Sequence, residues 1–264
     1  MRTVMFALFV LLPILSFADD WTPPENPDPH AILWEAKTDA QAGRHEVALA
    51  KQLWYHENAL ALQPAQSAVR LSFALSNWLE LGESYPPALK KMKQVRDDVE
   101  KRVRDEDQVR VKFVDFHEFV AFNRTLREEQ RTVETYKWLD ETNAEDAKRV
   151  FHVAKPALIK QKEYELCGKY IVADRDLKRI GENYERGLKL AKDKFGERHR
   201  EFTEKQFLNA STTLVALLVQ NDQKTEAEEA AMTAKKFVKN ADLQKKLDRQ
   251  LELALEGTVP TPWP

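Results

Sequence analysis

The sequence is poor in the residues that interrupt helices. Only 7 of its 264 residues are glycine, and none of these lies between Ala88 and Cys167. Most of the 12 prolines fall in the first 29 residues or in the last five. Alternating β-branched residues between glycine-containing turns, which are typical of strands, are also missing. Long stretches of Ala, Leu, Lys, Glu, Gln and Arg without breakers predict helices, so we expect an all-α fold.

Cysteine and a net charge of one sign are nearly absent as well. The single Cys167 excludes an internal disulfide, so stability must come from the apolar core. Its place on the apolar face of an expected helix favours a buried, unreactive thiol. The chain has 41 Lys and Arg against 43 Asp and Glu. Such a mixed surface gives no electrostatic reason to bind nucleic acid or anionic lipid.

A long apolar run is missing everywhere except at the start of the chain. Arg2 precedes an apolar stretch from Val4 to Phe17, which ends in the small-x-small triplet Ser16–Ala18. This pattern is typical of a secretory signal, and the stretch is too short to span a bilayer. We expect residues 1–18 to be cleaved and the mature chain to be exported, periplasmic or secreted, without an integral membrane span. An uncleaved anchor is the alternative.

Breakers and apolar periodicity divide the rest of the chain. Residues 19–29 and 257–264 are Pro-rich segments that we expect to be extended, whereas residues 30–256 form the helical domain. We expect Gly82 to end the third helix, and Pro86 to lie in the first turn of the fourth. The expected helices are His30–Ala42, His45–Leu62, Ala65–Leu81, Pro86–Arg104, Gln108–Leu126, Gln130–Glu141, Glu145–Lys160, Lys162–Ile171, Asp174–Phe195, Arg198–Gln220, Thr225–Asn240 and Leu243–Leu255.

Several links between these helices share one design, in which a small or polar linker joins two apolar segments. Helix pairs of this kind cannot bury their apolar faces alone, so we expect them to stack on their neighbours as a solenoid. The links are Ala42–His45, Leu81–Tyr85, Leu126–Gln130, Ile159–Glu163 and Val219–Gln223.

The first pair resembles a tetratricopeptide repeat. Gly43–Ala48 resembles that family's turn into its second helix, and Pro64 resembles its closing proline, about one helical turn later than a repeat of about 34 residues would place it. Trp78–Tyr85 fits the opening Trp-x2-Leu-Gly-x2-Tyr pattern, although a helix is already expected there. The resemblance is visible from Pro29 to Pro87. It implies a right-handed α-α superhelix whose concave face grips an extended peptide with Asn, Arg and Lys side chains.

Catalytic and metal-binding motifs are incomplete. His117 and Glu118 begin the zinc-protease motif His-Glu-x-x-His, but Ala121 stands where the second histidine is required. Asp105 opens a calcium-like loop, but Arg110 occupies the position that needs glycine. A glycine cluster for phosphate and a Gly-x-Ser-x-Gly elbow are both missing. We therefore expect no enzyme activity, no metal and no cofactor.

The leading hypothesis is an exported, non-catalytic scaffold or adaptor that binds a protein or peptide partner. The same residues also fit an ordinary aromatic core with a polar surface. The tryptophans of the two Pro-rich ends, Trp21 and Trp263, would dock either on the fold or on a partner. The candidate binding residues are polar and aromatic side chains near the apolar helices: Arg70, Asn77, Trp78, Tyr85, His117, Asn123 and Arg124.

Two other hypotheses remain open, and the sequence does not fix the oligomeric state. One is a helical-toroid enzyme, carbohydrate-active or lyase-like, in which His117 or His152 would act with two carboxylates. The other is a structural protein of the envelope that associates with itself.

Overall fold

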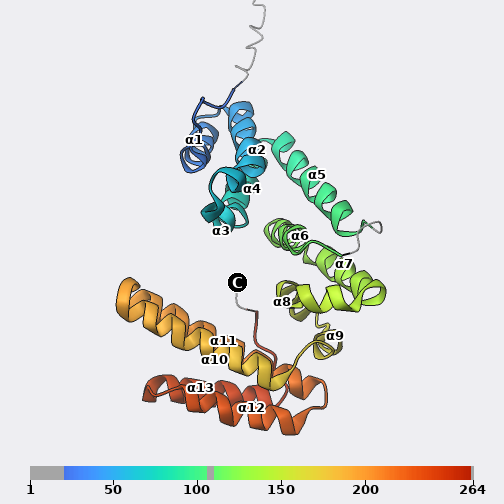
Figure 1. Ribbon diagram of the computed structural model, residues 1–264, viewed down its shortest axis with the longest axis vertical. Coiled ribbons are helices and arrows are strands. Elements are labelled where there is room, and N and C mark those ends of the chain that lie inside the picture. The colour runs from blue at the N-terminus through green and yellow to red at the C-terminus, as the bar shows by residue number, and fades with distance from the viewer. Residues whose placement is uncertain (1–20, 106–109, 263–264) are drawn as a thin grey trace, which may run out of the picture. The chain divides into compact units, whose positions relative to one another are not determined.

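The computed structural model describes residues 21–105 and 110–262, and this part of the chain is helical without strands (Figure 1). The prediction of an all-α fold is confirmed there. The predicted signal sequence, residues 1–18, and Trp263 lie outside the described residues. The helices are α1 Pro29–Gln41, α2 His45–Leu62, the 3-10 turn η1 Pro64–Gln66, α3 Ser67–Arg70, α4 Phe73–Ser84, α5 Pro86–Val103, α6 Phe113–Leu126, α7 Glu129–Thr142, α8 Ala144–Lys160, α9 Tyr164–Gly168, α10 Ala173–Leu190, the π-helical turn η2 Ala191–Phe195, α11 Glu197–Gln220, α12 Lys224–Phe237 and α13 Ala241–Leu255.

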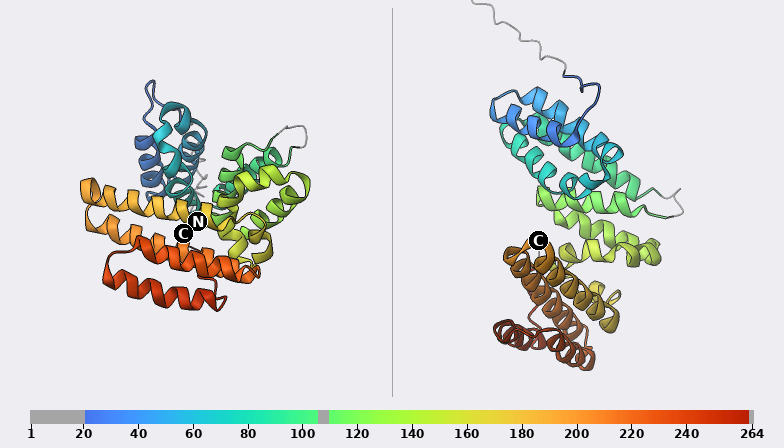
Figure 2. Two further views of the ribbon diagram at one scale, coloured as in Figure 1. Left: turned by 60° about the horizontal axis from the view of Figure 1, so that its bottom comes forward. Right: turned by 60° about the vertical axis from the view of Figure 1, so that its left-hand side comes forward.

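The chain divides into two compact units, residues 1–95 and residues 96–264, with the boundary inside α5. We call them the N-terminal unit and the C-terminal unit. In the N-terminal unit, α2 packs against α1, α3 and α4. In the C-terminal unit, α6, α7 and α8 pack on one another, and α11 packs against α10, α12 and α13 (Figure 2).

The predicted third helix, Ala65–Leu81, is wrong, because the structure divides it into three pieces. Pro64 begins a single 3-10 turn, α3 ends at Arg70, and α4 begins only at Phe73. Between them Ser72 leaves the helical region at φ −137° and ψ −91°, and its hydroxyl donates to the carbonyl of Ala68 at 2.6 Å. A serine side chain that bonds to the backbone in this way competes with regular helix formation.

The predicted stop at Gly82 is also wrong. Helix α4 continues through Gly82 to Ser84 and ends at Tyr85, which has φ −132° and ψ 89°. Proline disfavours helical dihedrals in the residue before it, so Pro86 sets this end. Gly82 has a packing role instead, since a Cβ there would lie 2.9 Å from the Cβ of Leu89 in α5.

Three further predicted helices differ in length. The predicted Lys162–Ile171 is reduced to the five residues of α9. The side chain of Asn221 fills the space beside Gly168 and donates to the carbonyl of Tyr164 at 2.9 Å. The predicted Asp174–Phe195 ends as α10 at Leu190 and continues as the π-helical turn η2. The predicted Gln108–Leu126 begins only at Phe113 as α6, and its first two residues lie outside the described ranges. The other predicted helices agree with the structure to within three residues at their ends.

Four links between paired helices share one backbone geometry. In each, a residue with positive φ lies two residues before the next helix, and its N–H bonds to the carbonyl three residues earlier. The following N–H bonds to the carbonyl five residues before it, at 2.8 to 2.9 Å. This pair of bonds is the Schellman motif, which satisfies the last carbonyls of a helix. The positive-φ residues are Gly43, Arg127, Lys162 and Asp222.

The equivalence of the four links continues into the second helix of each pair. Five residues after each positive-φ residue lies a small side chain that is fully buried, which allows the paired helices to approach closely. Gly257 ends α13 with the same two bonds, and it follows Asp222 by 35 residues, as Lys162 follows Arg127. The hairpin therefore recurs with constant geometry, although only one of the four links has glycine. The small residues are Ala48, Thr132, Cys167 and Ala227.

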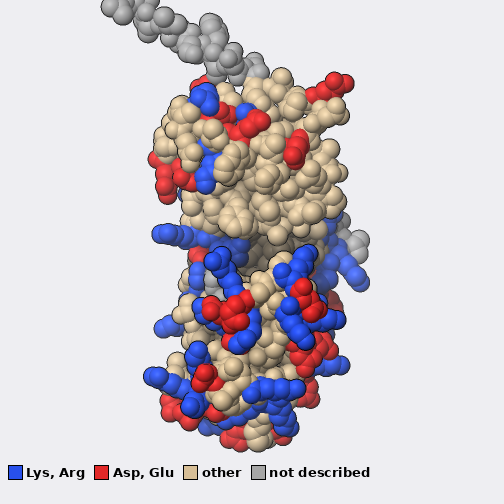
Figure 3. All heavy atoms as spheres, turned by 90° about the vertical axis from the view of Figure 1, so that its left-hand side faces the viewer, with Lys and Arg blue, Asp and Glu red and all other residues tan. Residues whose placement is uncertain are grey.

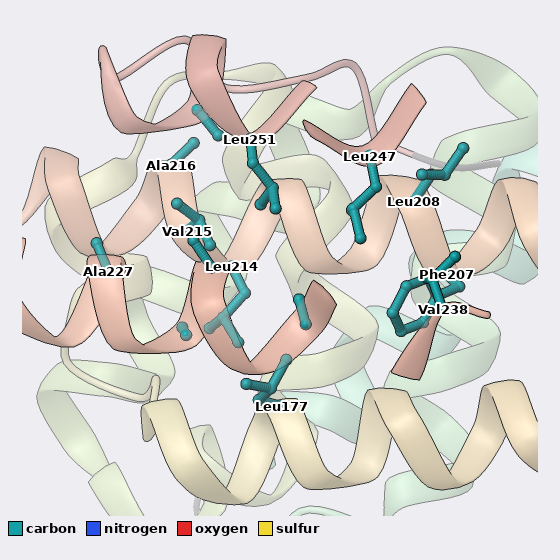
Figure 4. Packing of buried hydrophobic residues seen from close by; sticks show 14 of the residues in the cluster. Leu177, Phe207, Leu208, Leu214, Val215, Ala216, Ala227, Val238, Leu247 and Leu251 are labelled. Carbon is teal, nitrogen blue, oxygen red and sulfur yellow. The ribbon is translucent and has the colours of Figure 1, made fainter. Parts of the chain in front are cut away.

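Each unit has its own core. The described part of the N-terminal Pro-rich segment docks on the fold, because the ring of Trp21 packs edge-on against Trp54 at 6.2 Å. In the C-terminal unit, side chains of four helices meet in one cluster, here called the α10–α13 cluster (Figure 4). Its buried members are Leu177, Tyr184, Phe207, Leu208, Leu214, Val215, Ala216, Leu218, Ala227, Ala230, Ala231, Ala234, Val238, Leu243, Leu247, Leu251 and Ala254.

Candidate binding surface

Helices α6 and α8 carry two histidines at equivalent positions. His117 and His152 are exposed, and each lies ten residues before the positive-φ residue of its own hairpin. The ring of Phe113 lies 5.7 Å from the ring of His117 and 5.4 Å from that of His152, to which it is nearly parallel at 13°. The matched hairpins thus bring three rings from two helices together.

Desolvation and nearby cations lower the pKa of both histidines. Desolvation by neighbouring side chains is the largest effect on His117; the charge of Arg124 adds to it, as does that of His152 when its ring is protonated. Desolvation also lowers the pKa of His152, together with Arg179 and Lys155. Both imidazoles are therefore neutral at pH 7 and can donate and accept hydrogen bonds. We call this surface the cationic-aromatic face; it consists of Phe113, His117, Arg124, His152, Lys155 and Arg179.

Lys155 connects this face to α9 and α10. Desolvation lowers the pKa of its amine, the carboxylate of Asp176 opposes that shift, and the charge of Arg179 adds to it. Asp176 forms ion pairs with Arg175 at 3.2 Å and with Arg179 at 3.3 Å. Its negative charge is thus already shared between two guanidinium groups, so cations predominate on the face.

Cys167 lies in α9, close enough to Lys155 for the charge of that amine to influence the pKa of the thiol. It is fully buried, as the sequence predicts. Burial raises the pKa of the thiol to about 12, while Lys155 partly opposes this shift. Because the thiolate is the reactive form, this cysteine is poorly suited to nucleophilic or redox chemistry.

Two of the predicted binding residues lie entirely in the core. Asn123 of α6 donates to the hydroxyl of Thr132 at 3.1 Å and accepts from Arg96 at 3.2 Å, so it joins α5, α6 and α7. Trp78 of α4 donates from its indole nitrogen to the carbonyl of Ala88 in α5 at 3.0 Å. Neither side chain is exposed, and both fix neighbouring helices to one another.

Arg70, at the end of α3, is also buried. Its Nε donates to the carbonyl of His56 at 2.7 Å, and its terminal nitrogen lies 3.0 Å from Nε2 of the same residue. A guanidinium group only donates, so His56 accepts at Nε2. This contact attaches α3 to α2 and takes Arg70 away from the surface.

The remaining predicted residues are at least partly exposed, but they do not form one site. Asn77 lines a small cavity of about 90 Å³ in the N-terminal unit. Tyr85 of the same unit lies 5.5 Å from the ring of His45. Only His117 and Arg124 are brought together, on α6 of the C-terminal unit.

Sequence reasoning missed Phe113 and Arg179 as parts of this surface, and it considered His152 only as a catalytic residue. The spacing of 35 residues between His117 and His152 was the signal that could have found them, because the positive-φ residues Arg127 and Lys162 have the same spacing. Because Arg127 and Lys162 are not glycine, the sequence gives no sign that both residues have positive φ in equivalent turns.

A second concave surface lies between α10, η2, α11 and α12, with a volume of about 680 Å³. Tyr184 and Phe237 supply apolar area, and burial raises the pKa of the Tyr184 hydroxyl. Arg200 contacts Glu204 at 3.2 Å and Glu197 at 3.4 Å along α11. These charges offset one another within a single helix, so the cleft is less clearly directed at a ligand than the cationic-aromatic face.

In residues 21–105 and 110–262, no three His, Cys, Asp or Glu side chains are grouped so that they could hold a metal ion. The calcium-like loop at Asp105 continues into residues outside the described ranges. Among the helices that the structure describes, none has the length and apolar character needed to cross a bilayer.

Comparisons of this chain with family models, with curated proteins and with solved structures gave no match. The function must therefore be inferred from the geometry of the chain itself.

Proposed function

We propose that this protein is an exported, non-catalytic helical-repeat scaffold that binds an extended, acidic segment of a partner protein. The binding surface is the cationic-aromatic face. The observation that carries the proposal is the equal position of His117 and His152 in successive hairpins, with the ring of Phe113 between them. Repeat proteins bind partners on surfaces built in this way, from equivalent positions of neighbouring units.

The recurring hairpin supports the repeat part of the proposal. Four Schellman links, each followed by a small buried residue, are what a tetratricopeptide-like solenoid requires, because every pair must pack on the next in the same way. We propose a right-handed superhelix of such pairs. The first helix of each pair, such as α6 and α8, would then line the concave face that binds the partner.

The spacing of the two histidines suits an extended peptide. Packed helices lie about 8–10 Å apart, and an extended chain advances about 3.3 Å per residue. A peptide crossing α6 and α8 therefore passes from His117 to His152 in about three residues. Neutral imidazoles can bond to its backbone, Phe113 offers a stacking surface, and the surrounding cations attract carboxylates.

Binding suits this surface better than acid–base catalysis does. A catalytic histidine is typically oriented by a carboxylate. Here the rings of His117 and His152 pack against Phe113, and the charges that act on them come mainly from Arg124, Lys155 and Arg179. Cations in these positions would attract an anionic ligand to the face.

A peptide selection tests the proposal. A displayed library of random peptides is selected on the whole protein alone, and the enriched peptides are then titrated into the Arg124→Glu/Arg179→Glu variant. We expect acidic peptides to be enriched, and their affinity for the charge-reversed variant to fall at least about tenfold. Arg186→Glu is the matched control, since Arg186 is an exposed arginine of α10 that bonds to Asn183. Selected peptides that bind all three proteins equally would exclude this face.

The pH dependence of binding gives an independent test. The pKa values of His117 and His152 are lowered, so both rings gain a proton only as the pH falls below about 6.5. Protonation adds positive charge to the face, and we expect the affinity for an acidic peptide to rise over that interval. The His117→Ala/His152→Ala variant should lose this rise, which titration calorimetry at pH 7.5 and pH 5.5 measures.

Export is the part of the proposal that rests on residues 1–18 alone. We expect the full-length chain, expressed in a bacterial host, to be recovered from the periplasm or medium with Asp19 at its N-terminus. Mass spectrometry of the purified protein reads this end directly. Recovery of the uncut chain in the membrane fraction would favour an anchor instead.

A further inference from the structure

The tail that follows α13 runs back along α11 (Figure 1). The side-chain amide of Gln220 donates to the carbonyl of Gly257 at 2.6 Å, and that of Asn209 donates to the carbonyl of Thr261 at 2.8 Å. Both contacts join an amide on α11 to the backbone of the tail. The tail therefore lies antiparallel to α11 and is held at two separate points.

The distance between these two points requires an extended tail. Asn209 and Gln220 are separated by eleven residues, which is about 16 Å along a helix. The four steps along the chain from Gly257 to Thr261 reach about 14 Å when this segment is fully extended. The long amide side chains close the remaining gap. Pro260 favours this conformation because its ring fixes φ in the polyproline range.

Apolar contacts hold the same segment. Val259 packs against the α10–α13 cluster. Thr258 and Pro260 line one side of a cavity of about 370 Å³, and the other side consists of Lys205, Leu208, Asn209, Thr212, Gln250 and Leu253 from α11 and α13. The tail thus fills only part of a groove between these two helices.

We infer that α11 and α13 form a second binding groove, specific for extended, proline-containing peptides, and that the chain's own tail occupies it in this structure. The two amides recognise backbone carbonyls, which every peptide has. The apolar contacts of Val259 and Pro260 select for a small hydrophobic residue next to proline. A proline-containing segment loses little conformational entropy on binding, which favours such ligands.

The tail acts as a tethered competitor for this groove. A segment joined to its site by a short linker has an effective concentration in the millimolar range. An incoming peptide of similar affinity must displace it, so binding in trans is weak until the tail is released. The groove is formed by α11 and α13, whereas the cationic-aromatic face lies on α6, α8 and α10. The experiment on one surface can therefore contradict its proposal without affecting the proposal for the other.

Releasing the tail without altering the groove tests this inference. The variant Val259→Asp/Pro260→Asp changes only the tail. A labelled synthetic peptide of residues 256–262 is titrated into the wild-type protein and into this variant, with fluorescence anisotropy as the readout. We expect the variant to bind the peptide at least about tenfold more tightly than the wild type does. Equal affinities, or no binding to the variant, would overturn the inference.

The groove itself is tested in the tail-released background. Adding Asn209→Ala and Gln220→Ala should reduce peptide affinity at least about tenfold, because both backbone contacts are lost. Gln206→Ala is the matched control, since Gln206 is an exposed amide of the same helix. Circular dichroism shows whether the tail-released variant is folded.

If that variant is unfolded, Asn209→Ala/Gln220→Ala and Gln206→Ala are each made in the chain with its native tail, and the rate of tail removal by carboxypeptidase is compared. We expect the tail of Asn209→Ala/Gln220→Ala to be removed faster, and equal rates would contradict the proposed groove.

Discussion

The N-terminal core and the α10–α13 cluster of the C-terminal unit are stabilised by different means. Charged residues make up 15 of the 75 residues from 21 to 95, but 66 of the 169 residues from 96 to 264. Figure 3 shows this difference on one face, where the surface of the N-terminal unit is largely uncharged and that of the C-terminal unit interleaves both signs. The interiors differ in the opposite sense. The N-terminal core contains directional polar contacts, whereas the α10–α13 cluster of the C-terminal unit is almost entirely aliphatic.

The polar contacts of the N-terminal core each connect two helical segments. Gln52 of α2 donates to the carbonyl of Ala74 in α4 at 3.0 Å. Tyr55 donates to the side chain of Gln66 at 2.9 Å, and burial raises the pKa of this tyrosine to about 12. Arg70 bonds to His56. Directional bonds of this kind fix the positions of short segments that regular helix packing would leave ambiguous.

The largest effect is expected in the aliphatic cluster. Leu247 of α13 is fully buried there, so Leu247→Ala removes apolar contacts and leaves a cavity. We expect a loss of about 3 kcal/mol in the free energy of unfolding, measured by urea denaturation followed by circular dichroism. Leu247→Met, which nearly conserves volume, should cost less than about 1.5 kcal/mol. Similar losses for both variants would mean that packing volume is not what stabilises this cluster.

The N-terminal core should respond to a polar change instead. Arg70→Met retains much of the side-chain length but leaves the carbonyl and Nε2 of His56 without these two donors, so we expect a loss of about 2 kcal/mol. Tryptophan fluorescence can follow this unfolding, since four of the six tryptophans lie in this unit. Arg186→Met, at an exposed arginine of α10, should change stability by less than about 0.5 kcal/mol. Equal effects at the two arginines would mean that the buried contacts of Arg70 do not stabilise this core.

These polar contacts also mark where sequence reasoning failed. The bounds of α2 were predicted correctly because Gly43 and Pro64 stand beside its two ends. The break between α3 and α4 has neither glycine nor proline. It depends on the bond from the Ser72 hydroxyl to the backbone and on the contact of Arg70 with α2. Neither interaction can be predicted from the apolar periodicity of this segment.

The candidate site was predictable only in part, for a related reason. Exposure of His117 and Arg124 follows from helical periodicity, but the burial of Asn123 next to them depends on its partners Arg96 and Thr132, from α5 and α7. The neighbourhood of His117 and His152 requires the hairpins to be aligned. That alignment is set by backbone geometry at Arg127 and Lys162, where side-chain identity gives no hint of positive φ.

The shared turn allows the two units to be compared at one position. Gly43 has φ 77°, and a Cβ added to it would meet no atom within 4 Å, so Gly43→Ala tests backbone strain alone. We expect a loss of about 1 kcal/mol. Arg127 has φ 58° in the equivalent turn of the C-terminal unit, and Arg127→Gly should stabilise by about 0.5 kcal/mol, because relief of strain is partly offset by unfolded-state entropy. Thermal melts of both variants measure these changes, and the same sign at both positions would show that the turns are not equivalent.

The smallest effect is expected for a surface ion pair of the C-terminal unit. Lys137 lies 2.6 Å from Glu163, and both side chains are substantially exposed. Pairs of this kind gain little because water and salt screen them, so Lys137→Gln should change the free energy of unfolding by less than about 0.5 kcal/mol.

The corresponding substitution at a buried lysine, in the N-terminal unit, is Lys51→Gln. Lys51 is nearly buried and lies 2.8 Å from Asp39 and 2.7 Å from Glu35, so the change leaves the buried carboxylate of Asp39 with Arg44 as its remaining cation. We expect it to cost about 2 kcal/mol, several times the effect at Lys137. Repeating both measurements in 1 M NaCl sharpens the test, because salt should reduce the small effect at Lys137 further and leave the larger effect at Lys51 mostly unchanged. The difference between the two lysines would then follow from the burial of Lys51 and Asp39, which water and salt do not screen.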